Sequence, residues 1–210
     1  MRIVIVRHGE SEHNKIEKDV KIFCGAIDIN LTEEGKQSAI HLQNNEYIKS
    51  IEKIYSSDLI RAYDTARLST EKLGLEIKVD TRLRERSLGK FDGRYQDEVE
   101  KEYPEYFKSP DLKFRRDFVE KSPDGENYTD VSLRLKSFLE DLNINEISTI
   151  GIFSHMHAIR CLLYVLLGLT KEEILKLKIA NSDPIVVEGN KIGEFKLLSH
   201  KLEDMLSYGK

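Results

Sequence analysis

The sequence predicts an α/β fold with a mostly parallel central sheet of about six strands and helices on both faces. Two observations lead to this prediction. Short runs rich in β-branched residues, such as residues 2–6 and 148–153, alternate along the chain with segments of helical periodicity. One such segment, residues 128–142, repeats apolar residues at three- and four-residue spacings and so forms a stripe that can pack on a sheet. Parallel strands joined by helices are typical of this alternation.

Local signals define the individual elements. Thr32 is expected to cap a helix that carries acidic residues in its first turn, and Gly74 to close the next helix. Residues 189–193 are expected to turn between the last two strands. The expected strands span residues 2–6, 53–57, 76–79, 148–153, 184–189 and 194–199. The expected helices span residues 31–43, 57–74 and 128–142.

The length of the chain indicates one domain over residues 1–210, large enough to bury a core. Residues 94–127 interrupt the alternation because they are highly charged, contain three prolines and have weak periodicity. We interpret this segment as a helical and loop insertion that lies over the functional site.

Composition excludes several classes of protein. The sequence is 40% hydrophobic and 33% charged with a net charge of −4, so the overall charge suggests neither a nucleic-acid partner nor an anionic membrane. The longest apolar run, residues 161–169, is far too short to span a membrane. Cys24 and Cys161 lie far apart, and a disulfide is not expected. We therefore expect a cytoplasmic protein.

Unusual polar residues follow four of the predicted strands. In open α/β sheets, ligands bind beyond the carboxyl ends of the strands, so these residues are expected to face one cleft. They are Arg7, His8, Arg61, Glu85 and His155.

This set of residues suits phosphoryl transfer. A neutral imidazole is a nucleophile near pH 7, and arginine provides paired, permanently charged donors for phosphate oxygens. A second imidazole can stabilise the charge of the transition state, and a carboxyl group can protonate the leaving alcohol. Gly9 is expected to leave room for the phosphate to approach the backbone.

The motifs resemble those of the histidine phosphatase superfamily, the phosphoglycerate mutase-like proteins. The resemblance covers nearly the whole chain in order. It rests on RHGES at residues 7–11, CGAIDINLTEEGKQSA at 24–39, SSDLIRAYDTA at 56–66, RLRERSLGKFDG at 82–93, DGENYTDVSLRL at 124–135 and FSHMHAIR at 153–160.

The resemblance implies a metal-independent phosphomonoesterase that hydrolyses a small phosphorylated metabolite. His8 would form a covalent phosphohistidine, Arg7, Arg61 and His155 would hold the phosphoryl oxygens, and Glu85 would be the acid–base. No metal and no cofactor are implied. The residues expected to contact substrate are Ser11, Asn14, Gly25, Met156, Arg115 and Arg116.

Other interpretations remain open at this stage. Mutase activity is one alternative: Arg115 and Arg116 are similar to an arginine pair of the mutases, although the proline-rich loop that accompanies that pair is absent. A metal-dependent hydrolase using His155 and His157, and a non-catalytic member of the fold, are the others.

The sequence leaves the surroundings of the site undetermined. Met156 and His157 replace the Gly-Gly or Gly-Asn common in the family, and His157 can face the cleft or point away from it. Substrate selectivity is expected from the insertion, whose candidates include Tyr103, Tyr106 and Phe107. A homodimer is possible, with apolar edge strands near residues 185–187 as a candidate interface.

Overall fold

The computed structural model describes residues 1–16, 21–109, 112–142 and 148–206 of the chain. The strands are β1 (Arg2–Arg7), β2 (Lys53–Ser56), β3 (Ile77–Val79), β4 (Thr149–Ser154), β5 (Ile185–Glu188) and β6 (Lys196–Leu197). The α-helices are α1 (Glu12–Ile16), α2 (Glu33–His41), α3 (Glu46–Lys49), α4 (Ile60–Thr70), α5 (Gln96–Glu102), α6 (Tyr128–Glu140), α7 (Met156–Leu167), α8 (Lys171–Lys176) and α9 (Leu202–Met205).

The strands form one six-stranded sheet with the order β3-β2-β4-β1-β5-β6. Strands β1 to β4 pair in parallel, whereas β5 runs antiparallel to β1 and β6 antiparallel to β5. The prediction of a mostly parallel sheet is therefore confirmed, including the hairpin near the end of the chain. In the central pair, Arg7 lies opposite Ser154, so β1 and β4 end at the same level.

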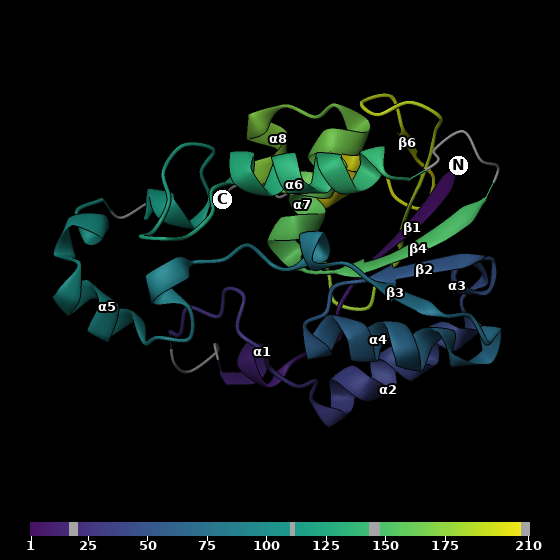
Figure 1. Cartoon of the computed structure of the whole chain (residues 1–210), viewed down its shortest axis with the longest axis horizontal. Coiled ribbons are helices and arrows are strands. Elements are labelled where there is room, and N and C mark those ends of the chain that lie inside the picture. The colour runs from purple at the N-terminus through teal and green to yellow at the C-terminus, as the bar shows by residue number, and fades with distance from the viewer. Residues whose placement is uncertain (17–20, 110–111, 143–147, 207–210) are drawn as a thin grey trace.

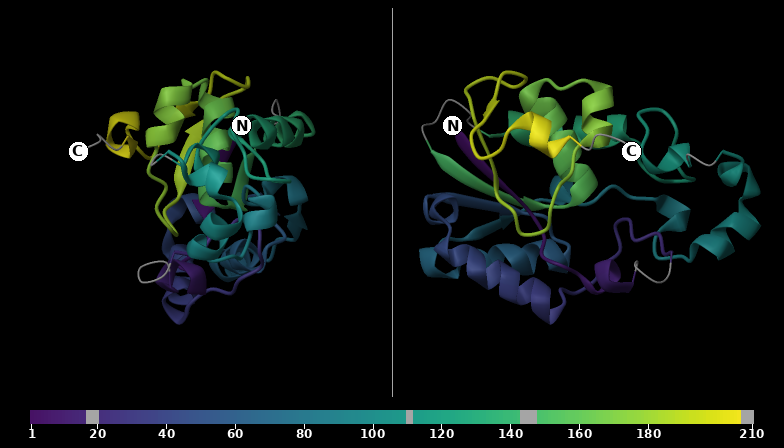
Figure 2. Two further views of the ribbon diagram at one scale, coloured as in Figure 1. Left: turned by 90° about the vertical axis from the view of Figure 1, so that its left-hand side faces the viewer. Right: turned by 180° about the vertical axis from the view of Figure 1, so that it is seen from behind.

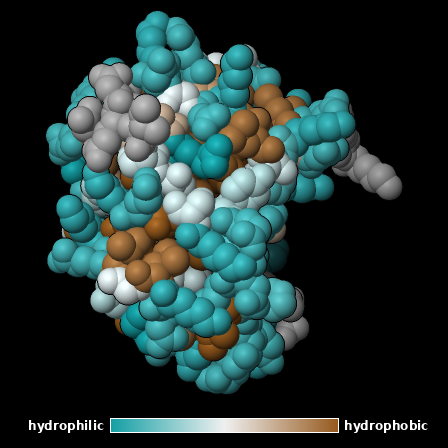
Figure 3. Space-filling model, turned by 90° about the vertical axis from the view of Figure 1, so that its right-hand side faces the viewer, coloured by the Kyte–Doolittle hydropathy of each residue, from teal (hydrophilic) through white to brown (hydrophobic). Residues whose placement is uncertain are grey.

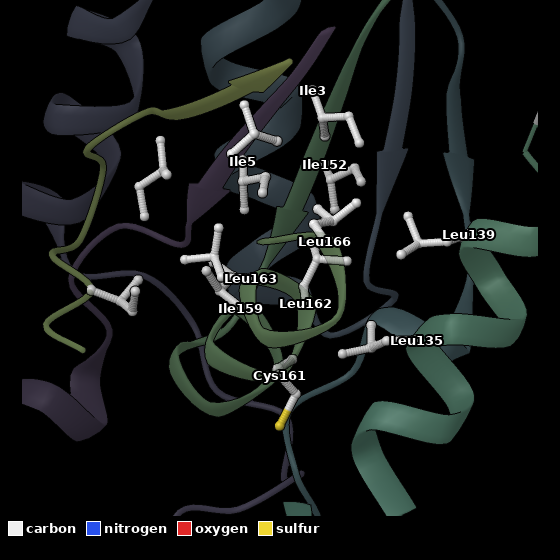
Figure 4. Packing of buried hydrophobic residues seen from close by; sticks show 14 of the residues in the cluster. Ile3, Ile5, Leu135, Leu139, Ile152, Ile159, Cys161, Leu162, Leu163 and Leu166 are labelled. Atoms are coloured by element: carbon white, nitrogen blue, oxygen red, sulfur yellow. The ribbon is translucent and has the colours of Figure 1, made fainter. Parts of the chain in front are cut away.

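Helices cover both faces of the sheet, as the sequence predicts. Helices α6, α7 and α8 lie on one face, and α2, α3 and α4 lie on the other (Figure 1). On the first face, isoleucines of β1 and β4 pack against leucines of α6 and α7 (Figure 4). On the second face, Val4, Val6 and Phe153 pack with Ile48 of α3 and Ala66 of α4. These two cores hold the carboxyl ends of β1 and β4 in place.

Side-chain caps define where several helices begin. Thr32 accepts a hydrogen bond from Gly35 N at the start of α2, as predicted. Asn127 and Asp130 form a capping box that begins α6. Gly74, at φ 63°, ends the 3₁₀ turn Glu71–Leu73 that follows α4. Helix α4 itself begins at Ile60, three residues later than the expected segment.

One expectation about the sheet is wrong. Strand β5 is not an edge strand, because it pairs with β1 on one side and β6 on the other. Its residues Ile185, Val186 and Val187 are buried in the two cores. The sequence could not show this, because a short apolar run has the same pattern in an edge strand and in a central strand. The candidate dimer interface at these residues is therefore withdrawn.

The two ends of the parallel strands face different surroundings. The face at the amino ends is mostly hydrophilic, with hydrophobic residues in separate patches (Figure 3). Beyond the carboxyl ends lie α1, α5 and the loops around them, seen from both sides in Figures 1 and 2. Among the described helices, none is long and apolar enough to cross a membrane.

Candidate active site

A cavity of about 130 Å³ lies beyond the carboxyl ends of β1 and β4. Every predicted site residue except His155 lines it. The lining residues are Arg7, His8, Ser11, His13, Asn14, Ile22, Phe23, Cys24, Gly25, Arg61, Glu85, Arg86, Leu88, Arg115, Arg116, Met156 and His157.

One ring nitrogen of His8 is hydrogen-bonded to the backbone, and the other keeps its lone pair. It follows β1 directly and is 5% exposed. Its Nδ1 lies 2.7 Å from Gly9 O. Because a carbonyl oxygen only accepts, Nδ1 carries the proton and Nε2 keeps its lone pair. Burial, then the charges of Arg7 and Arg61, hold the pKa of His8 well below 6.5. His8 is therefore neutral at pH 7, with Nε2 free to attack.

His155 lies next to His8 but does not line the cavity. The parallel register of β1 and β4 brings the two rings to a centroid distance of 5.2 Å. His155 is fully buried, and its Nε2 lies 2.9 Å from the hydroxyl of Ser57. Its Nδ1 is buried without a hydrogen-bond partner. Burial, followed by the charge of Arg61, lowers the pKa of His155 well below its usual value. A bound anion would oppose both effects and favour a proton on this ring.

Arg61 brings a buried positive charge to the cavity. It lies in the first turn of α4, and its side chain is almost completely buried. The guanidinium donates to Ile27 O at 2.7 Å and to Gly25 O at 3.3 Å. No acidic partner of Arg61 is found among the described residues. An uncompensated buried guanidinium beside a neutral imidazole is a site for an anion.

Asn14 and Ser11 are hydrogen-bonded to each other, and both line the cavity. The Oδ1 of Asn14 accepts from Ser11 N at 3.1 Å and from Ser11 Oγ at 3.0 Å. These bonds fix the amide so that its Nδ2 remains as a donor. Asn14 thus lines the same cavity as His8.

Glu85 is held at the first turn of α7. Its carboxylate accepts hydrogen bonds from Arg86 N at 2.8 Å, His157 N at 3.1 Å and Ala158 N at 3.2 Å. The amides of His157 and Ala158 lie in the first turn of α7, where they orient the carboxyl group of Glu85. Glu85 therefore lies on the cavity wall between the histidine pair and the insertion.

Arg134 supports the loop that carries Glu85. Its guanidinium pairs with Glu126 at 2.8 Å and donates to Arg82 O and Glu85 O. Glu126 in turn accepts from Ser87 N at 3.0 Å. Glu126, the glutamate of the sequence block DGENYTD, therefore binds the backbone of the Glu85 loop and does not line the cavity.

Most of the chain matches the profile of a known family. The profile of the histidine phosphatase superfamily, branch 1, matches residues 3–200.

The chain belongs to this superfamily.

Its relatives include phosphatases and mutases. Phosphoserine phosphatase 1 of Hydrogenobacter thermophilus is 32% identical over 174 residues, which is 80% of this chain and 77% of the relative. A 2,3-bisphosphoglycerate-dependent phosphoglycerate mutase of Bartonella tribocorum is 31% identical over 196 residues, covering 90% and 92%. The structure of mycobacterial glucosyl-3-phosphoglycerate phosphatase with VO3 superimposes with a TM-score of 0.78 at 29% identity, covering 93% of this chain and 96% of that one.

The insertion contributes cations to the cavity but mostly not its aromatic residues. Tyr103, Tyr106 and Phe107 pack instead with Phe91 and Phe114 in a small core of their own. The expectation that these three side chains select the substrate is therefore wrong: charged and apolar residues alternate irregularly in this segment, and the sequence could not show which side faces inward. Arg115 and Arg116 do line the cavity.

Gly9 has a different role from the one expected. A Cβ at this position would lie 2.5 Å from Gly35 O, and Gly9 N donates to Thr65 Oγ1 at 2.9 Å. The missing side chain therefore lets the loop after His8 approach the backbone of α2. A close approach between two backbones distant in sequence leaves no local signal.

Several residues of the cavity went unpredicted. Arg86 is buried and donates to three backbone oxygens, among them Phe114 O and Arg115 O, and so fixes the insertion beside Glu85. Its position next to Glu85 in the sequence was the only signal. Ser57, the partner of His155, follows β2 directly, and a hydroxyl at a strand end could have indicated it.

His157, whose direction the sequence left open, is the second residue of α7 and lines the cavity. Its ring contacts Tyr128, whereas that of His155 contacts Ser57. The two imidazoles therefore engage different partners. Within the described ranges, no cluster of three or more metal-ligating side chains is present.

Proposed function

We propose that this protein is a metal-independent phosphomonoesterase that acts through a phosphohistidine at His8. One observation carries the proposal: Nδ1 of His8 is held by Gly9 O, which leaves Nε2 as an unprotonated nucleophile beside the buried guanidinium of Arg61. The names of relatives as phosphatases support the reaction class.

In the first step, the Nε2 lone pair of His8 forms a bond to phosphorus while the bond from phosphorus to the ester oxygen breaks. Glu85, protonated, gives its proton to the departing oxygen, and the alcohol leaves. Arg7, Arg61 and the Asn14 amide bind the phosphoryl oxygens and stabilise their growing charge. The arginines thereby supply the positive charge that a metal ion provides in other phosphatases.

In the second step, the carboxylate of Glu85 takes a proton from water as the water oxygen attacks phosphorus. The N–P bond breaks and its electron pair returns to Nε2 of His8. Inorganic phosphate is released, and Glu85 is again protonated. His155 takes up a proton from solvent as the dianionic phosphoryl group binds, and this proton returns to solvent when phosphate is released.

The cations of the insertion favour a substrate with a second anionic group. Arg115 and Arg116 of the insertion line the same cavity as His8. Phosphoserine and glucosyl-3-phosphoglycerate, after which relatives are named, both carry a carboxylate near the phosphoester. We therefore propose a small phosphorylated carboxylic acid as the substrate class.

Mutase activity is the second candidate, because one relative named as a mutase covers 90% of this chain. A mutase would return the phosphoryl group of His8 to a second hydroxyl of the substrate instead of to water. The two activities therefore share the first step and differ in the acceptor of the second.

The experiment is to measure phosphate release from a panel of phosphomonoesters in the presence of EDTA, with wild type and His8→Ala side by side. We expect release by wild type and none by His8→Ala. Loss of wild-type activity in EDTA would contradict the metal-free mechanism. Conversion of 3-phosphoglycerate to 2-phosphoglycerate without net phosphate release would instead establish the mutase.

A further inference from the structure

His157 lines the cavity and uses one of its two ring nitrogens for a contact with the protein. It is the second residue of α7, and its Nδ1 lies 2.7 Å from the hydroxyl of Tyr128, with the two rings 5.7 Å apart. Tyr128 is fully buried at the start of α6, where packing fixes its position. The Nε2 of His157 has no protein partner among the described residues, and it is not one of the buried polar atoms that lack a partner. It therefore remains available to a ligand in the cavity.

The surroundings decide which nitrogen of His157 carries the proton. Burial, then the charges of Arg86 and Arg160, hold the pKa of His157 well below 6.5, so the ring is neutral at pH 7. Burial raises the pKa of Tyr128, and the nearby cation of Arg160 opposes this rise. A cation near the phenolic oxygen directs the hydroxyl proton away from itself, toward His157. Nδ1 then accepts from Tyr128, and Nε2 carries the hydrogen.

The position of His157 assigns this donor to the leaving group. Its backbone amide holds the carboxylate of Glu85, the group that protonates the ester oxygen in the proposed reaction. In the proposed reaction, we therefore expect the imidazole to lie beside the part of the substrate that follows the ester oxygen, because the phosphoryl oxygens would bind to Arg61 and Asn14.

We propose that His157 is a specificity-determining residue, whose Nε2–H donates to a hydrogen-bond acceptor on the leaving group, and that Tyr128 is its positioning residue. The proposal rests on the proposed phosphatase function and narrows its substrates to esters with a carboxylate or hydroxyl near the ester oxygen. Glycine, one of the two residues common at this position in the family, would provide no such donor.

The test compares two substrates of similar size, 3-phosphoglycerate and propyl phosphate, which differ in their acceptors. The measured quantity is the ratio of kcat/KM for the first over the second, in wild type, His157→Leu, His157→Gln and Tyr128→Phe. Tyr55→Phe is the matched control, because it removes a tyrosine hydroxyl from the same core at a residue that does not line the cavity.

We expect His157→Leu to lower the ratio by about tenfold, mainly through KM, the effect of losing one hydrogen bond to a charged acceptor. His157→Gln should recover part of the loss because it keeps a donor. Tyr128→Phe should lower the ratio by about threefold, because without the Tyr128 hydroxyl the proton of His157 is no longer confined to Nε2. Tyr55→Phe should leave the ratio unchanged.

An unchanged ratio in folded His157→Leu would overturn the inference while leaving the phosphatase intact. If Tyr128→Phe does not fold, the two His157 variants still decide the role of the donor. If wild type releases no phosphate from either ester, the proposed function fails, and the inference fails with it.

Discussion

Burial of neutral histidines makes the stability of this protein depend on pH. For His8, the pKa is near 6.5 in the unfolded chain and well below it in the native state. As the pH falls through 6.5, the unfolded chain binds a proton at this position and the native protein does not, so stability is lost. Between pH 7 and pH 5, this linkage removes about 2 kcal/mol from the free energy of unfolding for His8. His155 is buried in the same way and adds a loss of similar size.

The assay is urea unfolding at pH 7 and pH 5 in phosphate-free buffer, followed by circular dichroism because the chain has no tryptophan. Comparison with His8→Asn isolates one group, since the carboxylates titrate in both proteins. Wild type should lose about 2 kcal/mol more than His8→Asn over this range. His41→Asn, which removes an exposed imidazole, controls for the loss of a histidine. Equal losses in wild type and His8→Asn would refute the argument, because His8 would then bind its proton in the native state as well.

Two further predictions concern the acid and the loop of the site. Glu85→Gln should slow esters of poorly acidic alcohols by about 100-fold or more and p-nitrophenyl phosphate much less, because p-nitrophenolate leaves without a proton. Steady-state kinetics would show this, and equal losses on both substrates would exclude Glu85 as the acid. Gly9→Ala should lower the free energy of unfolding by about 1–3 kcal/mol, since its Cβ meets the backbone of Gly35. Urea unfolding measures this cost, and wild-type stability would contradict the close approach.

The architecture of the site could be predicted because it depends on strand ends. Parallel strands β1 and β4 end at the same level, so polar residues that directly follow apolar runs in the sequence meet in the structure. This is why the sequence predicts that Arg7, His8 and His155 lie together at one edge of the sheet. Helix caps such as Thr32 are equally local and were predicted correctly.

Features that depend on packing between distant segments could not be predicted in this way. The central position of β5 depends on its pairing with β1 and β6. The inward side of the insertion depends on Phe91 and Phe114, around which its aromatic residues gather. The direction of His157 depends on Tyr128, which lies 29 positions away in the chain.

The most direct test of the central claim is to quench the enzyme with alkali during turnover and look for phosphate bound to a histidine by mass spectrometry. Phosphohistidine survives alkali, and we predict that it is found at residue 8 in wild type. It should accumulate further in Glu85→Gln with p-nitrophenyl phosphate as the substrate, because this leaving group needs no proton whereas water is no longer activated. Peptide mapping should find no such label in His8→Ala. Turnover without any phosphorylated residue 8 would contradict the account, because the phosphoryl group would then pass directly to water.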